Sequence, residues 1–159
     1  MRFWRASVLQ GRGIEEAHAK AYGIFRIVDV SIVSPEKKVW QGEADLVVAR
    51  SPEGEFGIMR GHIPFLAALV PGRVRVVSGS YSEEFFVPGG FLEASGPQDD
   101  YHVIVLADDA DNVADLDAAE ARERLDEARR RNEKEQDERT QAQLQIELAR
   151  VEIAESRGQ

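Results

Sequence analysis

The central part of the chain, residues 24 to about 109, consists of short runs of β-branched and aromatic residues separated by glycine, proline and polar residues. Such runs favour strands, because these side chains fit a pleated surface, and the residues between them favour turns. The Gly79-Ser80 turn predicts a β-hairpin. Many short strands without helices between them predict an antiparallel β-sandwich or a barrel. The predicted strands are residues 24–33, 39–41, 44–51, 56–59, 65–70, 73–77, 81–87, 91–95 and 101–107.

After residue 110 the apolar residues recur every three or four positions, and residues 111–157 contain neither glycine nor proline. This period is typical of a helix that packs along one side. Asp115 is the predicted N-cap of a helix from residue 116 to about 135. Because the apolar stripe is lean, this helix must gain most of its stability from packing against a partner. The stripe consists of Ala118, Ala121, Leu125 and Ala128.

A second helix is predicted at residues 141–156, after a polar stretch at 132–140 that we interpret as the connection. Its apolar residues fall on two nearly opposite faces when about 100° is allowed for each residue. A helix with two apolar faces is expected to contact two partners, namely the first helix and either the sandwich or another subunit. One face holds Leu144, Leu148 and Val151, and the other holds Ala142, Ile146, Ala149 and Ile153.

The chain is therefore predicted to fold as an N-terminal antiparallel β-sandwich at residues 24–110, followed by a C-terminal α-helical hairpin at 111–159. With 159 residues, of which 43% are hydrophobic, it can bury a core of its own. Residues 1–23 show no sustained period. We expect them to be disordered, or to be an artefact of expression or of the assigned start codon.

The formal net charge of −9 restricts the possible partners. A nucleic-acid binder needs a cationic face to displace counterions, and an acidic chain gains little from an anionic lipid surface. We therefore expect no nucleic-acid partner and no direct insertion into lipid. The sequence contains neither an apolar run of about 18 residues nor a secretory signal, so the chain is expected to stay where it is made.

The sequence carries no motif of a catalytic or metal site. It has no cysteine, and His18, His62 and His102 lie in separate regions without the spacing of metal ligands. Glycine-rich phosphate loops, the zinc-protease helix motif and the nucleophile elbow are absent. We therefore expect no catalytic residue, no metal ligand and no enzymatic activity from this chain alone.

The stretch from residue 53 to 66 predicts a tightly shaped turn. Glycines stand at positions 54, 57 and 61, and His62 precedes an X-Pro bond at Ile63-Pro64. These features restrict the backbone to a specific course. The stretch is either a constrained connection between strands or a shaped contact surface, and the residues alone leave both readings open.

Several short segments stand out when the sequence is taken in order. They are Val33-Ser-Pro-Glu, Trp40-Gln-Gly-Glu-Ala-Asp, Glu53-Gly-Glu-Phe-Gly-Ile, Gly61-His-Ile-Pro, Pro88-Gly-Gly-Phe-Leu-Glu and Val105-Leu-Ala-Asp, with Asp115-Leu-Asp-Ala-Ala-Glu-Ala and Glu147-Leu-Ala-Arg in the tail. In this order and spacing they resemble the epsilon subunit of bacterial F-type ATP synthases. The resemblance covers about residues 24 to 156, and one block alone would be weak, whereas six in series are specific. The first 23 residues match nothing in that family.

The resemblance implies a non-catalytic subunit of the central stalk, which helps couple ion flow through the membrane to ATP synthesis. The sandwich would bind the gamma subunit through one edge and touch the ring of membrane c subunits. Glu55, Gly61 and His62 are the residues expected to face the c-ring. The expected location is the cytoplasmic side of the bacterial plasma membrane, as a peripheral protein.

In that family the hairpin either folds on the sandwich or extends along gamma toward the alpha/beta catalytic head, where it restrains ATP hydrolysis. The resemblance suggests that a cationic cluster meets acidic segments of that head in the extended state. A solvated charged face is the alternative interpretation. The cluster consists of Arg122, Arg124, Arg129, Arg130 and Arg131.

Some members of that family bind ATP at the hairpin through a motif that begins at the positions of Leu116 and Asp117 here. Glu120 stands where the motif has an arginine. A carboxylate repels a triphosphate, although Arg122 or Arg124 could supply a cation instead. No cofactor is expected, and ATP binding is predicted to be weak or absent.

Two further interpretations remain open at the level of the residues. The chain could be a free-standing β-sandwich binding module whose helical tail mediates oligomerisation, although the first helix lacks sustained heptads. It could also be a hydrolase that uses carboxylates, although no acidic pair lies in an apolar setting of the kind that a general acid requires.

Overall fold

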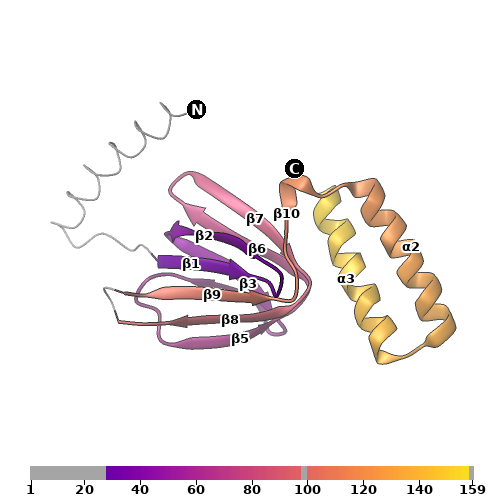
Figure 1. Ribbon diagram of the computed structural model, residues 1–159, viewed down its shortest axis with the longest axis horizontal. Coiled ribbons are helices and arrows are strands. Elements are labelled where there is room, and N and C mark those ends of the chain that lie inside the picture. Colours follow the sequence, from indigo (N-terminus) through magenta and orange to yellow (C-terminus); the bar gives the residue numbers. More distant parts are fainter. Residues whose placement is uncertain (1–27, 98–99, 158–159) are drawn as a thin grey trace.

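The computed structural model of the chain describes residues 28–97 and 100–157. Within this part, ten strands form two sheets, and two helices follow as an antiparallel pair, as Figure 1 shows. The predicted sandwich and helical hairpin are thus confirmed. The N-terminal extension predicted at 1–23 lies outside the described residues, as do the first four residues of the strand predicted at 24–33.

The first sheet, sheet A, has the strand order β2-β1-β9-β8-β5. Its neighbours are antiparallel except for β1 and β9, which are parallel, a feature that the predicted antiparallel sandwich did not include. This pairing joins the first strand of the sandwich to the last strand of sheet A. The strands are β1 (Val28–Val33), β2 (Lys38–Ala44), β5 (Phe65–Leu69), β8 (Gly90–Ser95) and β9 (His102–Ala107).

The second sheet, sheet B, has the order β10-β7-β6-β3-β4, and all its neighbours are antiparallel. The hairpin predicted at Gly79-Ser80 is present, with Ser78 paired to Tyr81. The strand predicted at 44–51 begins two residues later than expected. The strands are β3 (Leu46–Ser51), β4 (Gly54–Ile58), β6 (Gly72–Ser78), β7 (Tyr81–Val87) and the short β10 (Asp111–Asn112).

The main core lies between the two sheets. Alternate residues of each strand point inward, as the period of two requires, and most are valine, isoleucine or leucine. The largest side chains that are almost completely buried there include Ile32, Ile58 and Leu92. This core fixes the register of the strands that contribute to it, because a shift by one residue would expose their apolar side chains to water.

The hairpin begins with a short 3-10 turn, η1 (Val113–Asp115), followed by α2 (Ala118–Glu135) and α3 (Glu138–Glu155). The predicted N-cap at Asp115 is wrong, because this residue ends the 3-10 turn. The N-cap of α2 is Asp117, whose Oδ1 accepts the backbone N–H of Glu120 at 2.9 Å. The helix therefore starts two residues later than expected, where a carboxylate can satisfy a free backbone donor.

The connection between the helices is shorter than the predicted stretch 132–140, and only Gln136 and Asp137 lie between α2 and α3. Gln136 adopts a left-handed conformation with φ of 47°, and Asp137 and Thr140 form a capping box. The Thr140 hydroxyl also donates to the Asn132 side chain at 3.1 Å across the tip. The polar composition of this stretch thus reflects caps and exposed helix surface.

The capping box gives the hairpin tip a defined response to acid. The Thr140 backbone N–H donates to the Asp137 carboxylate at 2.8 Å, and this hydrogen bond lowers the pKa of Asp137, with a further contribution from the Thr140 side chain. A carboxyl with a lowered pKa stabilises the fold above its unfolded pKa of about 4, and this contribution is lost as the pH falls through the folded pKa. We expect a carboxyl NMR titration to place the pKa of Asp137 below 3.8. In Thr140→Ala it should rise part of the way back, because the backbone donor remains. An ordinary pKa in the wild-type chain would contradict the capping box.

Candidate interaction surfaces

The described residues contain no group of three or more histidine, aspartate or glutamate side chains placed to hold a metal ion. Across the same residues, neither helix combines the length and the apolar character needed to cross a membrane. Three surface features do stand out, and each would suit contact with another protein or with a ligand.

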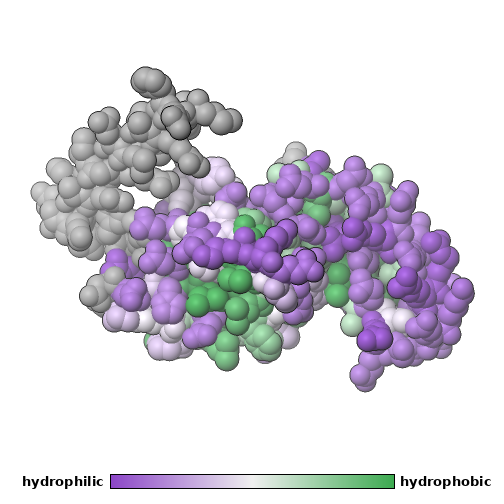
Figure 2. Space-filling view, in the orientation of Figure 1, coloured by the Kyte–Doolittle hydropathy of each residue, from purple (hydrophilic) through white to green (hydrophobic). Residues whose placement is uncertain are grey.

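The first feature is an exposed apolar face on the outside of sheet A, which we call the sheet A face. Phe91 of β8 lies opposite Leu106 of β9, and the two are 53% and 52% exposed. Their neighbours in sequence, Leu92 and Val105, are fully buried on the other side of the sheet. Leu66 of β5 is 67% exposed. Figure 2 shows a hydrophobic patch on the part of the sandwich where Figure 1 has β5, β8 and β9.

The sheet A face contains a carboxylate near its centre. Glu93 of β8 is exposed and lies opposite Leu66 on one side and Ile104 on the other. Monomeric proteins rarely leave a large contiguous apolar patch in water, and such patches often mark contact sites. A partner for this face would therefore present mainly apolar side chains, with a cation positioned for Glu93.

The second feature is the turn between β4 and β5, which contains the residues predicted to meet a membrane ring. Gly61 has a φ of +84°, a left-handed conformation that favours glycine. The His62 backbone N–H donates to the Met59 carbonyl at 3.1 Å, and its Nδ1 donates to the Ile63 carbonyl at 2.7 Å. The imidazole packs edge-on against Phe65, with 5.5 Å between ring centroids. These contacts restrict the shape of the turn.

This turn also presents apolar surface. Ile63 is 73% exposed and Met59 is 47% exposed, while Gly61 is exposed and His62 is half-buried. Glu55 lies on β4, exposed, opposite Arg50 of β3. The three residues predicted for ring contact thus lie on one β4–turn segment and are accessible in whole or in part.

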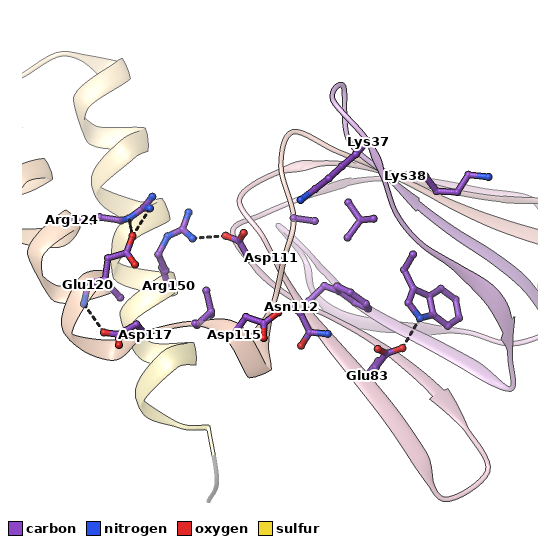
Figure 3. A pocket seen from close by; sticks show the side chains of 16 residues that line it. Lys37, Lys38, Glu83, Asp111, Asn112, Asp115, Asp117, Glu120, Arg124 and Arg150 are labelled. Carbon is purple, nitrogen blue, oxygen red and sulfur yellow. Dashed lines mark hydrogen bonds and ion pairs between the residues drawn. The ribbon is translucent and has the colours of Figure 1, made fainter. Parts of the chain in front are cut away.

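The third feature is a cleft of about 470 Å³ between the sandwich and the hairpin. Figure 3 shows the side chains that line it. Leu116 and Asp117, the positions of the predicted nucleotide motif, are both among them. Carboxylates outnumber cationic groups in this lining. The acidic residues are Glu83, Asp111, Asp115, Asp117 and Glu120, and the basic residues are Lys37, Lys38, Arg124 and Arg150.

Most of these charges already have partners. Glu120 accepts two hydrogen bonds from Arg124, at 3.1 and 2.7 Å, and this contact raises the pKa of the Arg124 guanidinium. The Asp117 carboxylate caps α2. At the sandwich end, the Trp40 indole donates to Glu83 at 2.5 Å, joining sheet A to sheet B. Arg124 lines the cleft, but Glu120 holds its guanidinium.

The five arginines predicted to contact a catalytic head do not form a free cationic patch. Four are paired with carboxylates of the hairpin, and Arg122 reaches across from α2 to Glu155 of α3 at 2.7 Å. Among the five, Arg130 is exposed and has no ion pair within the described residues. The pairs on α2 itself are Glu120–Arg124, Asp126–Arg129 and Glu127–Arg131.

Sequence reasoning missed one functional candidate, Arg150. Its side chain is only 9% exposed, and it reaches from α3 to Asp111 of β10, with Nη1 to Oδ2 at 2.7 Å, as Figure 3 shows. Its guanidinium also lies 4.5 Å from the centre of the Phe86 ring. The available signal in the sequence was an arginine between the apolar residues Ala149 and Val151, three residues after Glu147.

Comparison with known proteins agrees with these features. The sequence profile of the family described as "ATP synthase, Delta/Epsilon chain, beta-sandwich domain" matches residues 27–113. The chain is 35% identical to the "ATP synthase epsilon chain, sodium ion specific" of Propionigenium modestum over 130 residues, which are 79% of this chain and 92% of that one. It is 40% identical to the ATP synthase epsilon chain of Nitratidesulfovibrio vulgaris (strain DP4) over 128 residues, or 78% of this chain and 92% of the relative.

A solved structure shares the fold. A chain in the cryo-EM structure of the Euglena gracilis mitochondrial ATP synthase superposes with a TM-score of 0.67 at 23% identity, covering 83% of this chain and 81% of that one. The profile match spans more than half of the sequence, and the relatives are matched over most of their length. The chain therefore belongs to the family of ATP synthase epsilon chains.

Proposed function

We propose that this chain is a non-catalytic subunit of the central stalk of a rotary ATP synthase, where it connects the gamma subunit to the membrane ring and restrains ATP hydrolysis through its hairpin. The observation that carries the proposal is the sheet A face, an apolar surface that the chain's own hairpin leaves uncovered. Family membership indicates which complex the chain joins, and the sheet A face offers a surface for contact with another subunit of that complex.

The gamma subunit is the proposed occupant of the sheet A face. Phe91, Leu106 and Leu66 expose more than half of their surface, and an obligate subunit contact would remove them from water. The sequence suggested that an edge of the sandwich meets gamma, whereas these exposures favour the flat outer surface of sheet A. Because the Glu93 carboxylate lies on this face, the gamma subunit should place a cationic side chain opposite it within an otherwise apolar contact.

The turn around His62 is the proposed contact with the c-ring, together with Glu55. A stalk that transmits torque needs a contact whose shape does not yield, and the His62 hydrogen bonds and its packing on Phe65 hold this turn in one conformation. Exposed Ile63 and Met59 provide apolar surface beside it. An acidic protein can act at a membrane in this way because the ring, rather than lipid, provides the surface.

The hairpin is the proposed regulatory element, and its contact with the alpha/beta head would involve the arginines of α2. Since most of them are already paired with neighbouring carboxylates, binding to the head requires these pairs to be exchanged. Arg130 needs no such exchange and is the best candidate for a first contact. The proposed location is the cytoplasmic side of a bacterial plasma membrane, in agreement with the bacterial relatives.

A free-standing module that oligomerises through its tail is the weaker alternative. The apolar residues of α3 that would drive such self-association, Ile153 and Ala154, are buried against the chain's own sandwich. Leu148, at 37% exposed, is the large apolar side chain of the described part of the hairpin that remains open to water.

The sheet A face gives a direct test. The double substitution Phe91→Glu, Leu106→Glu places two charges where apolar contact is required. It is expected to weaken binding of a purified gamma subunit more than tenfold, the size of one interface hot spot of about 2 kcal/mol. The measurement is calorimetry, followed by reconstitution of coupled ATP synthesis. Tyr81→Glu is the matched control, because Tyr81 is 59% exposed on sheet B. Unchanged gamma binding by a folded double variant would contradict the proposal, and loss of self-association alone would favour the oligomerising module.

The turn around His62 is tested in the same reconstitution. His62→Ala removes the side-chain hydrogen bond to the Ile63 carbonyl and the packing on Phe65, so it should lower the rate of coupled ATP synthesis. An unchanged rate would contradict the ring contact.

The cleft gives a prediction for ATP. Because its lining is rich in carboxylates and Glu120 holds Arg124, the isolated chain is expected to bind ATP with a dissociation constant weaker than about 1 mM. Glu120→Arg removes the repulsion, frees Arg124, and is expected to raise the affinity by about tenfold or more, that is by ~1.4 kcal/mol. Glu123→Arg makes the same change of charge on α2 outside the cleft and serves as the control. Titration calorimetry measures all three, and tight binding by the wild-type chain or an equal gain in Glu123→Arg would contradict the prediction.

A further inference from the structure

The contact between the hairpin and the sandwich has a small apolar part. Its buried residues come from the outer side of sheet B, from the η1 segment and from the two helices. Phe86 of β7 is the large side chain among them and is fully buried. They are Phe86, Val113, Leu116, Ala121, Ile153 and Ala154, with Ala118, Ile146, Ala149 and Val151 packed partly buried against them. Several of these side chains are alanines, which bury little surface, so the polar contacts also matter for holding the hairpin in place.

Three arginines supply polar contacts that join α3, or the two residues after it, to the sandwich or to residues 114–116. Arg73 of β6 donates to the Ser156 hydroxyl and pairs with Glu84 at 3.0 Å. Arg157 donates to the carbonyls of Ala114 and Leu116, at 2.5 and 2.7 Å. The contacts of Arg73 and Arg157 lie at the C-terminal end of α3. Arg150 is the arginine of the three that is buried within the contact.

Arg150 has partners of two kinds. Asp111 and Phe86 belong to the sandwich, and Arg150 contacts them only while the hairpin is docked. Glu147 lies one turn earlier on α3 itself, and its Oε2 accepts from Arg150 Nε at 3.1 Å. Glu147 is 4% exposed and also accepts from Gln143 at 2.8 Å, on the same helix. One set of contacts must break when the hairpin leaves, and the other set can move with it.

We propose that Arg150 is a releasable latch for the hairpin: Asp111 and Phe86 hold it in the docked state, and Glu147 keeps it paired when α3 moves away. The inference deepens the proposed regulatory function and rests on it, since it presupposes a hairpin that leaves the sandwich. The latch makes undocking a local event, because no buried carboxylate of α3 loses its partner. It also makes the docked state sensitive to salt, because the Asp111 side chain is 42% exposed and ions can screen its charge.

The two carboxylates should therefore behave differently. Asp111→Asn preserves the shape of the side chain and removes the charge that Arg150 meets on the sandwich. It is expected to lower the ratio of docked to undocked hairpin by about tenfold, while both helices stay folded. Glu147→Gln removes the contact that travels with α3, and is expected to lower the thermal stability of the hairpin with a smaller effect on docking.

The absence of cysteine makes a distance measurement straightforward on the full chain. Spin labels on Ser80→Cys and Gln145→Cys, both exposed positions, report the separation of the sandwich and α3 by pulsed electron resonance. The expected result is a larger population at long distance in Asp111→Asn than in the wild-type chain. Rising salt should increase this population in the wild-type chain, whereas in Asp111→Asn it should have no further effect. Asp115→Asn is the matched control, because Asp115 is an exposed cleft carboxylate four residues further along the same segment.

Three outcomes would overturn the latch. Unchanged distances in Asp111→Asn would show that the contact does not hold the hairpin. Loss of helical circular dichroism in that variant would show that it maintains the fold of the hairpin instead. An equal effect of Asp115→Asn would reveal a general effect of charge.

ATP hydrolysis by the complex reconstituted with Asp111→Asn separates the latch from the proposed function. If the distances lengthen while the rate of hydrolysis stays the same, the latch stands and the proposed restraint of hydrolysis fails.

Discussion

Strand β7 places two consecutive phenylalanines in two different cores, and the arrangement of the whole chain depends on this alternation. Phe85 points into the sandwich, and Phe86 points outward, where the hairpin covers it. Phe86 is fully buried only because α3 and the η1 segment lie over it, and Arg150 stacks on its ring. A single strand thus fastens sheet B to sheet A on one side and to the helices on the other.

The two outer faces of the sandwich consequently differ in character. The outside of sheet B is partly occupied by the chain's own hairpin, whereas the sheet A face, with Phe91 and Leu106, stays open. Because these surfaces lie on different sheets, a partner seated on sheet A does not compete with the hairpin for space. Assembly into a complex and the proposed movement of the hairpin could therefore occur independently, as the proposed roles of structural link and regulator require.

The sequence predicted the sandwich and the hairpin because strand and helix periods are local properties, and the glycine blocks that suggested the family have physical causes in the fold. A Cβ atom at Gly90, in the Pro-Gly-Gly block, would lie 2.1 Å from the Leu106 carbonyl, and one at Gly42 would lie 2.9 Å from the Trp40 ring. The site was harder to predict. Asp111 and Arg150 lie far apart in the sequence, and nothing local reveals that β10 brings them together. The cap at Asp117 was missed because Asp115, two residues earlier, could cap a helix equally well, and only the packing of the helix selects between them. Asp137 is the single aspartate of the stretch 132–140, and its cap was missed because that whole polar stretch was interpreted as the connection.

The parallel pair of β1 and β9 has a consequence for the order in which the protein can be built on the ribosome. Sheet A cannot be completed until β9, ending at Ala107, has emerged, because β1 has no partner on that side before then. The helices α2 and α3 follow the sandwich along the chain and are synthesised after it. Phe86 therefore lacks the helix residues that cover it until α3 has been synthesised, and until then the nascent chain leaves this aromatic side chain exposed on sheet B.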